Sequence, residues 1–243
     1  MDLKKIKFKY DNLGYVVLKN FITKDKAENI KKNLILYLDE KKSSLSKRNI
    51  NFTKGNIINS VHDLNDWKFT REIQRNPYLL KIVNTLLNDK PKKFGSELFA
   101  KPAKVGLASP SHQDNYYWCI DSSSGLTVWI SLDKSSDRNG AIYYYEGSHN
   151  LGLLEHEPSY MPGSSQKIKY EKGLSKFKKI TPKLNPGDCL IHHCLVVHGS
   201  TINKTLNSRI GWTLRYIGKK SKFDTFLKKN YERKLSNQLK SKK

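Results

Sequence analysis

Between residues 93 and 217, short β-rich segments alternate with turns, and this pattern limits the possible folds more than any other feature of the sequence. Asn139-Gly140 suits a hairpin turn, and the stretch from Asn185 to Asp188 suits a tight reversal. Many short strands separated by such turns are typical of all-β sandwiches and barrels. The predicted strands cover residues 94–100, 112–120, 126–132, 141–145, 189–197 and 211–217.

A helical part precedes these strands. An amphipathic helix is predicted from Thr23 to about Leu38, after a β-rich run at 15–18, and Asn76-Pro77 begins a second helix with one apolar face. The polar residues 41–58 predict a loop or flap. Because 243 residues can form one large β core, we expect a single domain of residues 1–243. Its parts are a helical preface at about 20–90, a β core at about 91–218 and a Lys-rich C-terminal helix or tail at 219–243.

The chain carries a formal net charge of +23, which would suit a nucleic-acid partner. Only seven of its 45 basic residues are arginine, the side chain that phosphate and base recognition favours, so we expect a solvated Lys-rich surface instead. No segment is apolar enough to cross a bilayer, and Cys119, Cys189 and Cys194 lack Cys-x-x-Cys spacing. These features predict a cytoplasmic protein with free thiols, and they leave the oligomeric state open.

His112-Gln113-Asp114 and the distant His198 indicate a metal site. Side chains two residues apart on a strand point to one face, so His112 and Asp114 could both turn inward. A second imidazole from another strand would complete a 2-His-1-carboxylate triad, which leaves coordination positions free and suits non-haem Fe(II). His192 lies on the same predicted strand as His198 and shares its orientation, so a triad with His192 is an alternative.

Several blocks of the sequence resemble the phytanoyl-CoA dioxygenase family of Fe(II)- and 2-oxoglutarate-dependent oxygenases, from about Tyr10 to Ile217. The blocks are Gly95–Pro102, His112–Trp118, Thr127–Asp133, Asn139-Gly140, Gly147–His149, Pro186–Asp188 and His198–Ser200 followed by Arg209. The resemblance implies a mainly β fold with flanking helices, a double-stranded β-helix (jelly-roll, cupin-like) barrel with iron at one mouth. Residues 150–180, which lack clear periodicity, are expected to form an insert over that mouth.

The same resemblance implies a role for each site residue. His112, Asp114 and His198 would bind iron, and the spacing to Arg209 favours His198 over His192. Arg209 and Ser200 would hold the distal carboxylate of 2-oxoglutarate, because a buried carboxylate without a partner costs several kcal/mol. Thr127 and Trp129 are expected to contact the co-substrate as well, although core packing also explains Trp129.

The implied reaction consumes O2 and 2-oxoglutarate, releases succinate and CO2, and hydroxylates a small-molecule substrate through an iron(IV)-oxo intermediate. Asp114 disfavours halogenation, because related halogenating enzymes carry a small residue at that position. Strand alternation would turn Tyr116 and Trp118 toward a polar or anionic substrate. The further expected substrate contacts are Gln113, Asn115 and Lys101.

Two other functions stay open. The same iron chemistry could act on a nucleic acid or a protein, which would require lysines gathered around the mouth of the site. Alternatively, the chain could be a non-catalytic metal-binding β-barrel. The presence of Arg209 and Ser200 argues against a passive binder, because such a protein has no use for a carboxylate clamp.

Overall fold

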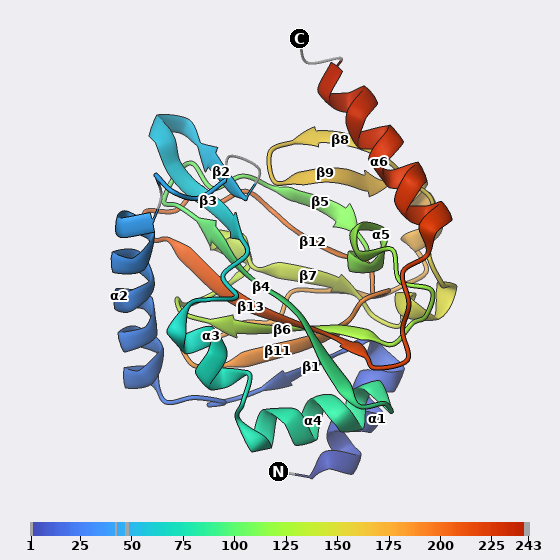
Figure 1. Ribbon diagram of the computed structural model, residues 1–243, viewed down its shortest axis with the longest axis horizontal. Coiled ribbons are helices and arrows are strands. Elements are labelled where there is room, and N and C mark those ends of the chain that lie inside the picture. The colour runs from blue at the N-terminus through green and yellow to red at the C-terminus, as the bar shows by residue number, and fades with distance from the viewer. Residues whose placement is uncertain (1, 42, 47–48, 241–243) are drawn as a thin grey trace.

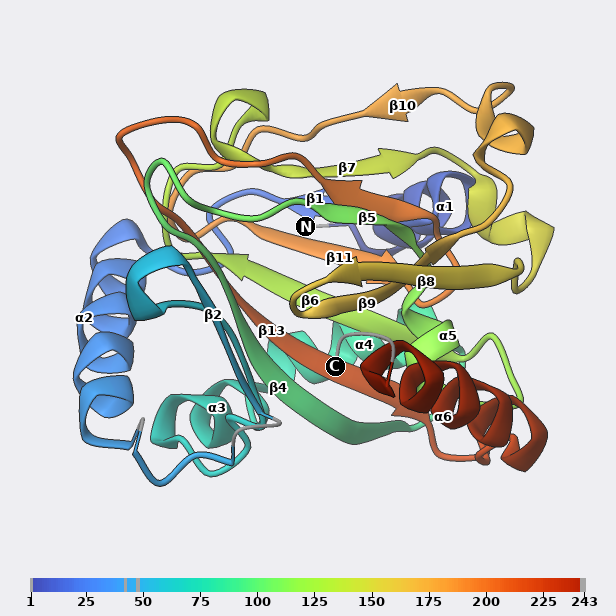
Figure 2. The ribbon, with the colours of Figure 1, turned by 90° about the horizontal axis from the view of Figure 1, so that it is seen from above.

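Two antiparallel sheets form the centre of the computed structural model, which describes residues 2–41, 43–46 and 49–240. The larger sheet has the strand order β1-β11-β6-β13-β4-β3-β2, and the smaller has the order β10-β7-β12-β5. The strands of the larger sheet are β1 (Tyr15–Leu18), β2 (Ile50–Thr53), β3 (Ile57–His62), β4 (Pro91–Lys101), β6 (Gly125–Ser131), β11 (Cys189–His193) and β13 (Arg209–Gly218). Those of the smaller sheet are β5 (Ser109–His112), β7 (Ile142–Tyr145), β10 (Lys179–Ile180) and β12 (His198–Ser200). Figure 2 shows the sheets as two layers, with β7 and β10 on one side and β6, β13 and β4 on the other.

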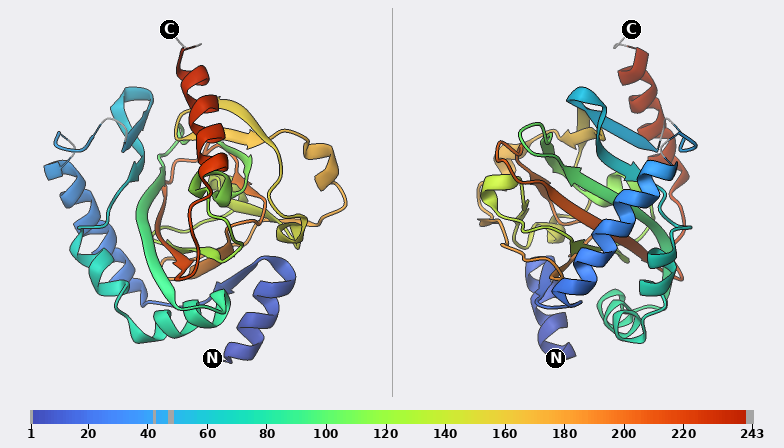
Figure 3. Two further views of the ribbon diagram at one scale, coloured as in Figure 1. Left: turned by 45° about the vertical axis from the view of Figure 1, so that its right-hand side comes forward. Right: turned by 90° about the vertical axis from the view of Figure 1, so that its left-hand side faces the viewer.

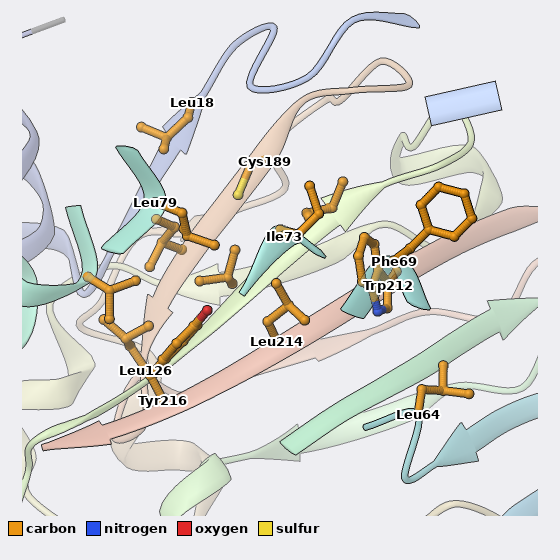
Figure 4. Packing of buried hydrophobic residues seen from close by; sticks show 14 of the residues in the cluster. Leu18, Leu64, Phe69, Ile73, Leu79, Leu126, Cys189, Trp212, Leu214 and Tyr216 are labelled. Atoms are coloured by element: carbon orange, nitrogen blue, oxygen red, sulfur yellow. The ribbon is translucent and has the colours of Figure 1, made fainter. Parts of the chain in front are cut away.

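Four helices pack on the outer face of the large sheet (Figures 1 and 2). They are α1 (Leu3–Leu13), α2 (Lys24–Lys41), α3 (Lys68–Ile73) and α4 (Pro77–Leu87). Capping defines two of their ends: the Asn76 side chain accepts hydrogen bonds from the Tyr78 and Leu79 amides, and Gly14 ends α1 with φ +80°. In Figure 4 apolar side chains from α3 and α4 pack against Trp212, Leu214 and Tyr216 of β13. All of these side chains belong to the main hydrophobic core.

Alternation along the strands divides the large sheet into two chemically different faces. Along β13, Trp212, Leu214 and Tyr216 face the helices, whereas Arg209, Thr213 and Arg215 have the opposite parity and face the smaller sheet. A second apolar cluster fills part of the space between the sheets. Its buried members are Tyr15, Trp129, Tyr144, Leu184, Leu190 and Val196. Arg209 and Arg215 are therefore the charged residues of β13 that point inward, toward the space that this cluster partly fills.

A separate hairpin and the last helix cover one end of the two sheets. The hairpin consists of β8 (His156–Met161) and β9 (Ser164–Ile168), and the helix α6 (Thr225–Lys240) packs against β8 and the short helix α5 (Asp114–Trp118). At the hairpin turn, a Cβ on Gly163 would lie 3.1 Å from Ser60 Oγ of β3. Figure 3 shows α6 at this end of the molecule, with the two termini far apart. The four 3-10 helices are Lys54–Asn56, Asp137–Asn139, Ser148–Leu151 and Glu171–Leu174.

The expected mainly β fold with flanking helices is confirmed. The two sheets stay separate in the described part of the chain, so closure into a complete barrel is not observed. The insert expected at 150–180 is the β8–β9 hairpin with its flanking turns, and it lies against β5 and α6. The loop or flap predicted at 41–58 contains instead β2 and the start of β3, while residues 42, 47 and 48 lie outside the described residues.

Two of the predicted strands are too long, and the error changes the local structure around the expected metal ligands. The strand expected at 112–120 ends at His112, and Asp114 begins α5. The strand expected at 189–197 ends at His193, and a turn leads to β12 in the other sheet. Apolar and aromatic residues fill both segments, so residue type alone did not reveal where each strand stops.

The ends of the chain also differ from the expectation. Residues 3–13 form α1, a helix that was not expected from the sequence. The C-terminal helix is not merely solvated, because Tyr231 of α6 packs edge-to-face on Tyr116 and Tyr117 at ring-centroid distances of 6.1 and 5.7 Å. No helix in the described ranges has both the length and the apolar character needed to span a membrane.

Candidate metal centre

His112, Asp114 and His198 meet between the two sheets. One ligand atom from each of the three side chains can be chosen so that all lie within 4.8 Å of one another. The Nε2 atoms of His112 and His198 lie 3.9 and 3.7 Å from Asp114 Oδ1. His112 ends β5 and His198 begins β12, and these two residues are paired neighbours in the smaller sheet. Two imidazoles and one carboxylate oxygen around a single point can hold a divalent metal ion.

The second oxygen of Asp114 is held by the large sheet. Thr127 of β6 donates to Asp114 Oδ2 at 2.6 Å, and His192 Nε2 of β11 lies 3.0 Å from the same oxygen. Tyr144 Oη lies 2.8 Å from His192 Nδ1, so both ring nitrogens of His192 already have partners. Oδ1 therefore remains for a metal. This arrangement favours His198 over His192 as the second imidazole ligand.

Hydrogen bonds prepare the two imidazoles for metal binding. His112 Nδ1 donates to the Pro110 carbonyl at 2.8 Å, and His198 Nδ1 donates to the Val196 carbonyl at 3.0 Å. With the proton on Nδ1, each Nε2 presents a lone pair toward Asp114. Burial lowers the pKa of both histidines, which keeps them neutral. Burial alone would raise the pKa of Asp114, but the hydrogen bond with His192 and the three nearby imidazoles bring it well below its ordinary value.

Gln113, expected to contact substrate, is instead fully occupied within the protein. Its side chain is completely buried; it donates to the Gly152 and Leu195 carbonyls, each at 2.7 Å, and accepts from the Leu154 amide at 2.7 Å. These bonds tie the His112–Asp114 segment to the turn that leads to His198. The Gln113 side chain thus connects the segment that carries His112 and Asp114 to the turn before His198. Both its amide nitrogen and its amide oxygen already have partners, so neither is left for a ligand.

We therefore expect Gln113→Leu to weaken metal binding by about 10- to 100-fold, the range found when outer partners of metal ligands are changed. Titration with Co(II), followed by its visible absorption, would measure this affinity. Ile82→Val, a core change in α4 far from the triad, serves as a control for a modest loss of stability of about 0.5–1.5 kcal/mol. Unchanged Co(II) affinity in Gln113→Leu would contradict the positioning role.

Two buried basic side chains lie side by side at the ends of β13 and β4. Arg209 and Lys101 are paired in register, and only 2% and 4% of their surfaces are exposed. Arg209 Nη2 donates to the Gly140 carbonyl at 2.8 Å, but its buried Nε has no partner. The Lys101 ammonium donates to the Leu107 carbonyl. No carboxylate among the described residues forms an ion pair with either side chain, so a bound anion would supply the missing charge.

The surroundings of Arg209 match a carboxylate site. Its guanidinium lies 5.4 Å from the ring centre of Trp129, whose Nε1 is also buried without a partner. Ser200 lies two residues after His198 on β12 and is nearly buried. Burial lowers the pKa of Arg209 to about 10, which leaves it charged at neutral pH. Lys101, predicted to meet substrate, thus lies beside Arg209 and belongs to the same anion site.

The remaining predicted substrate contacts are spread along α5, because this segment is helical rather than extended. Tyr116 stacks on His156 at 4.0 Å, and the Asn115 side chain closes a turn by bonding the Ile120 backbone. Trp118 is buried and packs against Phe94 at 5.2 Å. The alternation argument for Tyr116 and Trp118 was therefore wrong. Among the rings of α5, Tyr117 approaches the triad, with its centre 5.7 Å from that of His112.

Comparison with known proteins agrees with this geometry. The family model for phytanoyl-CoA dioxygenase matches residues 10–211. The peroxisomal phytanoyl-CoA dioxygenase of Mus musculus is 24% identical over 226 residues, covering 86% of this chain but 66% of its own, so the chain spans slightly less than two thirds of that relative.

Solved structures share the fold. EctD from S. alaskensis, solved with 2-oxoglutarate and 5-hydroxyectoine, superposes with a TM-score of 0.77 at 20% identity, covering 92% of this chain and 78% of EctD. SnoK, a non-heme alpha-ketoglutarate-dependent carbocyclase, gives a TM-score of 0.73 at 18% identity, covering 90% of this chain and 85% of SnoK. The match of the family model over residues 10–211 establishes that the chain belongs to the phytanoyl-CoA dioxygenase family.

Proposed function

We propose that this protein is an Fe(II)- and 2-oxoglutarate-dependent dioxygenase that hydroxylates a small molecule. The observation that carries the proposal is a 2-His-1-carboxylate triad together with Arg209, a buried guanidinium that has no ion-pair partner among the described residues. A passive metal site would require only the triad. An oxygenase of this class also requires a place for the far carboxylate of its co-substrate, and a guanidinium provides it best.

Each residue has a defined task in this proposal. His112, Asp114 and His198 would hold Fe(II), and the ion with its co-substrate would supply oxygen activation and substrate oxidation. Arg209 would pair with the distal carboxylate of 2-oxoglutarate, with Lys101 and Ser200 beside it and Trp129 as one wall. Thr127 and His192 would keep Asp114 oriented by holding Oδ2.

The three cysteines are free and buried, which is consistent with the reducing conditions of a cytoplasmic location.

A small-molecule substrate is favoured over a nucleic acid. Two surface hollows lined in part by lysine lie at the outer, helix-covered side of the large sheet, whereas the triad lies on its inner side. Their lining includes Lys7, Lys90, Lys93, Lys219 and Lys220. A polyanion bound along these lysines would thus lie on the opposite side of the sheet from the metal site.

The defining test uses the purified protein without oxygen. Addition of Fe(II) and 2-oxoglutarate should give the weak visible charge-transfer band of the chelate, and admission of air should then release succinate. A protein that binds Fe(II) but shows neither the band nor succinate would be a passive metal binder.

Lys101 predicts how 2-oxoglutarate affinity depends on pH. Burial and the nearby Arg209 lower the pKa of Lys101 to about 6, so the free protein holds this amine mainly neutral above that pH. A bound carboxylate would favour the protonated amine, and binding would then take up a proton. We expect affinity to fall as pH rises from 6 to 9, by at most about tenfold per pH unit. Calorimetric titration across this range would measure the slope, and Lys101→Met should remove it.

A further inference from the structure

A charged cluster of Glu97, Arg215 and His62 lies on the inner side of the large sheet, apart from the metal ligands and the Arg209 site. Arg215 Nη2 of β13 lies 3.1 Å from Glu97 Oε1 of β4, and His62 Nδ1 of β3 lies 2.7 Å from the same oxygen. Burial opposes ionisation of Glu97, but Arg215 and His62 outweigh it and lower its pKa. The cluster is therefore a fixed pair of opposite charges with a histidine beside it.

The strand register places this cluster next to the triad. Arg215 is the direct neighbour of Thr127, which donates to Asp114, and Glu97 is the direct neighbour of Thr213 on the same inner face. The side chains of Arg215 and His62 remain 21% and 29% exposed, while that of Glu97 is 9% exposed. The cluster therefore lies beside the surroundings of the metal site and is also partly exposed to solvent.

The packing holds the guanidinium in one place. Arg215 lies over Gly95, where an added Cβ would come within 2.5 Å of Nη2, so any other residue at position 95 would displace it. The aromatic rings of Phe94 and Trp118 lie 5.3 and 5.8 Å from its central carbon. A charge fixed between a glycine and two rings is preorganised for recognition.

The cluster also retains unused hydrogen-bonding capacity. Both partners of Glu97 approach Oε1, and among the described residues no hydrogen bond to Oε2 is observed. Arg215 Nε is buried without a partner. Because His62 Nδ1 approaches Glu97 Oε1, Nε2 is the ring nitrogen that remains for a further partner. Buried ion pairs contribute little net stability compared with apolar packing, so fold stability alone gives a weak reason for this cluster.

We propose that Arg215 and Glu97 bind the polar group of the substrate, and that this group carries both a positive and a negative charge. This inference rests on the proposed oxygenase function. A net anion would be repelled by Glu97 and a net cation by Arg215, whereas a zwitterion can place its carboxylate on Arg215 and its ammonium on Glu97. The Arg209–Lys101 site, with two basic side chains and no ion-paired acid among the described residues, is instead suited to a purely anionic end of a ligand.

The test compares probes that share a framework but differ in charge. The ring set is pipecolate, piperidine and cyclohexanecarboxylate, and the linear set is 6-aminohexanoate, hexylamine and hexanoate. Each is titrated calorimetrically into the anaerobic protein loaded with Fe(II) and 2-oxoglutarate. In the unmodified protein we expect a zwitterion of at least one set to bind about 10- to 100-fold more tightly than its singly charged analogues.

Two variants should reverse this preference in opposite directions. Arg215→Gln leaves Glu97 alone and should favour the amine, whereas Glu97→Gln leaves Arg215 alone and should favour the carboxylate. Lys26→Gln and Glu72→Gln remove the same charges from an exposed ion pair and should leave the zwitterion preferred. A purely structural cluster would lower the melting temperature without any exchange of preference.

Equal affinity for all members of both sets, or no binding of either zwitterion, would overturn the inference. The chelate band and the succinate released by the unmodified protein without added probe report on the oxygenase function separately. Presence of both signals together with a failed charge preference would reject the substrate class alone.

Discussion

Asp114→Ala should abolish iron-dependent succinate formation. Removal of this side chain takes away the only carboxylate of the triad and leaves His112 and His198 to hold the ion alone. Changes to residues that merely support a metal ligand already cost about 10- to 100-fold in metal affinity, so the loss of the ligand itself should exceed this range. Titration with Fe(II) under nitrogen, together with an assay of succinate in air, would measure both effects.

Thr127→Val is the matched comparison for Asp114→Ala. It retains the carboxylate but removes the 2.6 Å hydrogen bond to Oδ2, so metal binding should weaken within the 10- to 100-fold range rather than disappear. If Asp114→Ala retained the Fe(II) affinity of the unmodified protein, the assignment of Asp114 as a metal ligand would be wrong. The metal would then have to bind through other side chains.

Arg209→Ala should weaken 2-oxoglutarate binding by about 10- to 100-fold while sparing the metal. A charge-assisted hydrogen bond to a buried carboxylate contributes about 1.5–3 kcal/mol, which corresponds to this loss of affinity. The intensity of the chelate band as a function of 2-oxoglutarate concentration gives the dissociation constant. Co(II) titration of the same variant checks that the triad is intact.

Arg209→Lys provides the graded control. It keeps a positive charge but cannot form the two-pronged contact of a guanidinium, so its affinity should lie between those of the unmodified protein and Arg209→Ala. Equal 2-oxoglutarate affinity in all three proteins would remove Arg209 from the co-substrate site. The buried Nε of Arg209, which has no partner among the described residues, would then need a different explanation.

Much of the metal site could be predicted because its residues are of rare types at informative positions. The sequence alone indicates His112, Asp114 and His198 as ligands, and all three meet around one point. The physical reason given for the first pair was nevertheless incorrect. His112 and Asp114 come together because a strand ends and a helix begins between them, not because they alternate along one strand.

Other contacts depend on which residues of neighbouring strands are paired. The spacing of residues along a single strand does not reveal this pairing. No partner for His62 could be predicted from the sequence, yet strand pairing places it opposite Glu97, and Glu97 reaches Arg215 across β4 and β13. One usable signal was present: positions 97 and 215 share the inward parity of positions 101 and 209 on the same two strands. The role of Gln113 was hidden because its three partners belong to distant turns.

Asp114 links the two layers of the fold, with one oxygen toward imidazoles of the small sheet and the other toward Thr127 and His192 of the large sheet. A metal ion bound at Oδ1 would connect the two layers, whose strands are not paired with each other in the described part of the chain. Loading with metal should therefore slow amide exchange in the short strands β5 and β12 more than in the long strands β4 and β13. The two layers would then be held together more rigidly in the metal-bound protein than in the metal-free protein.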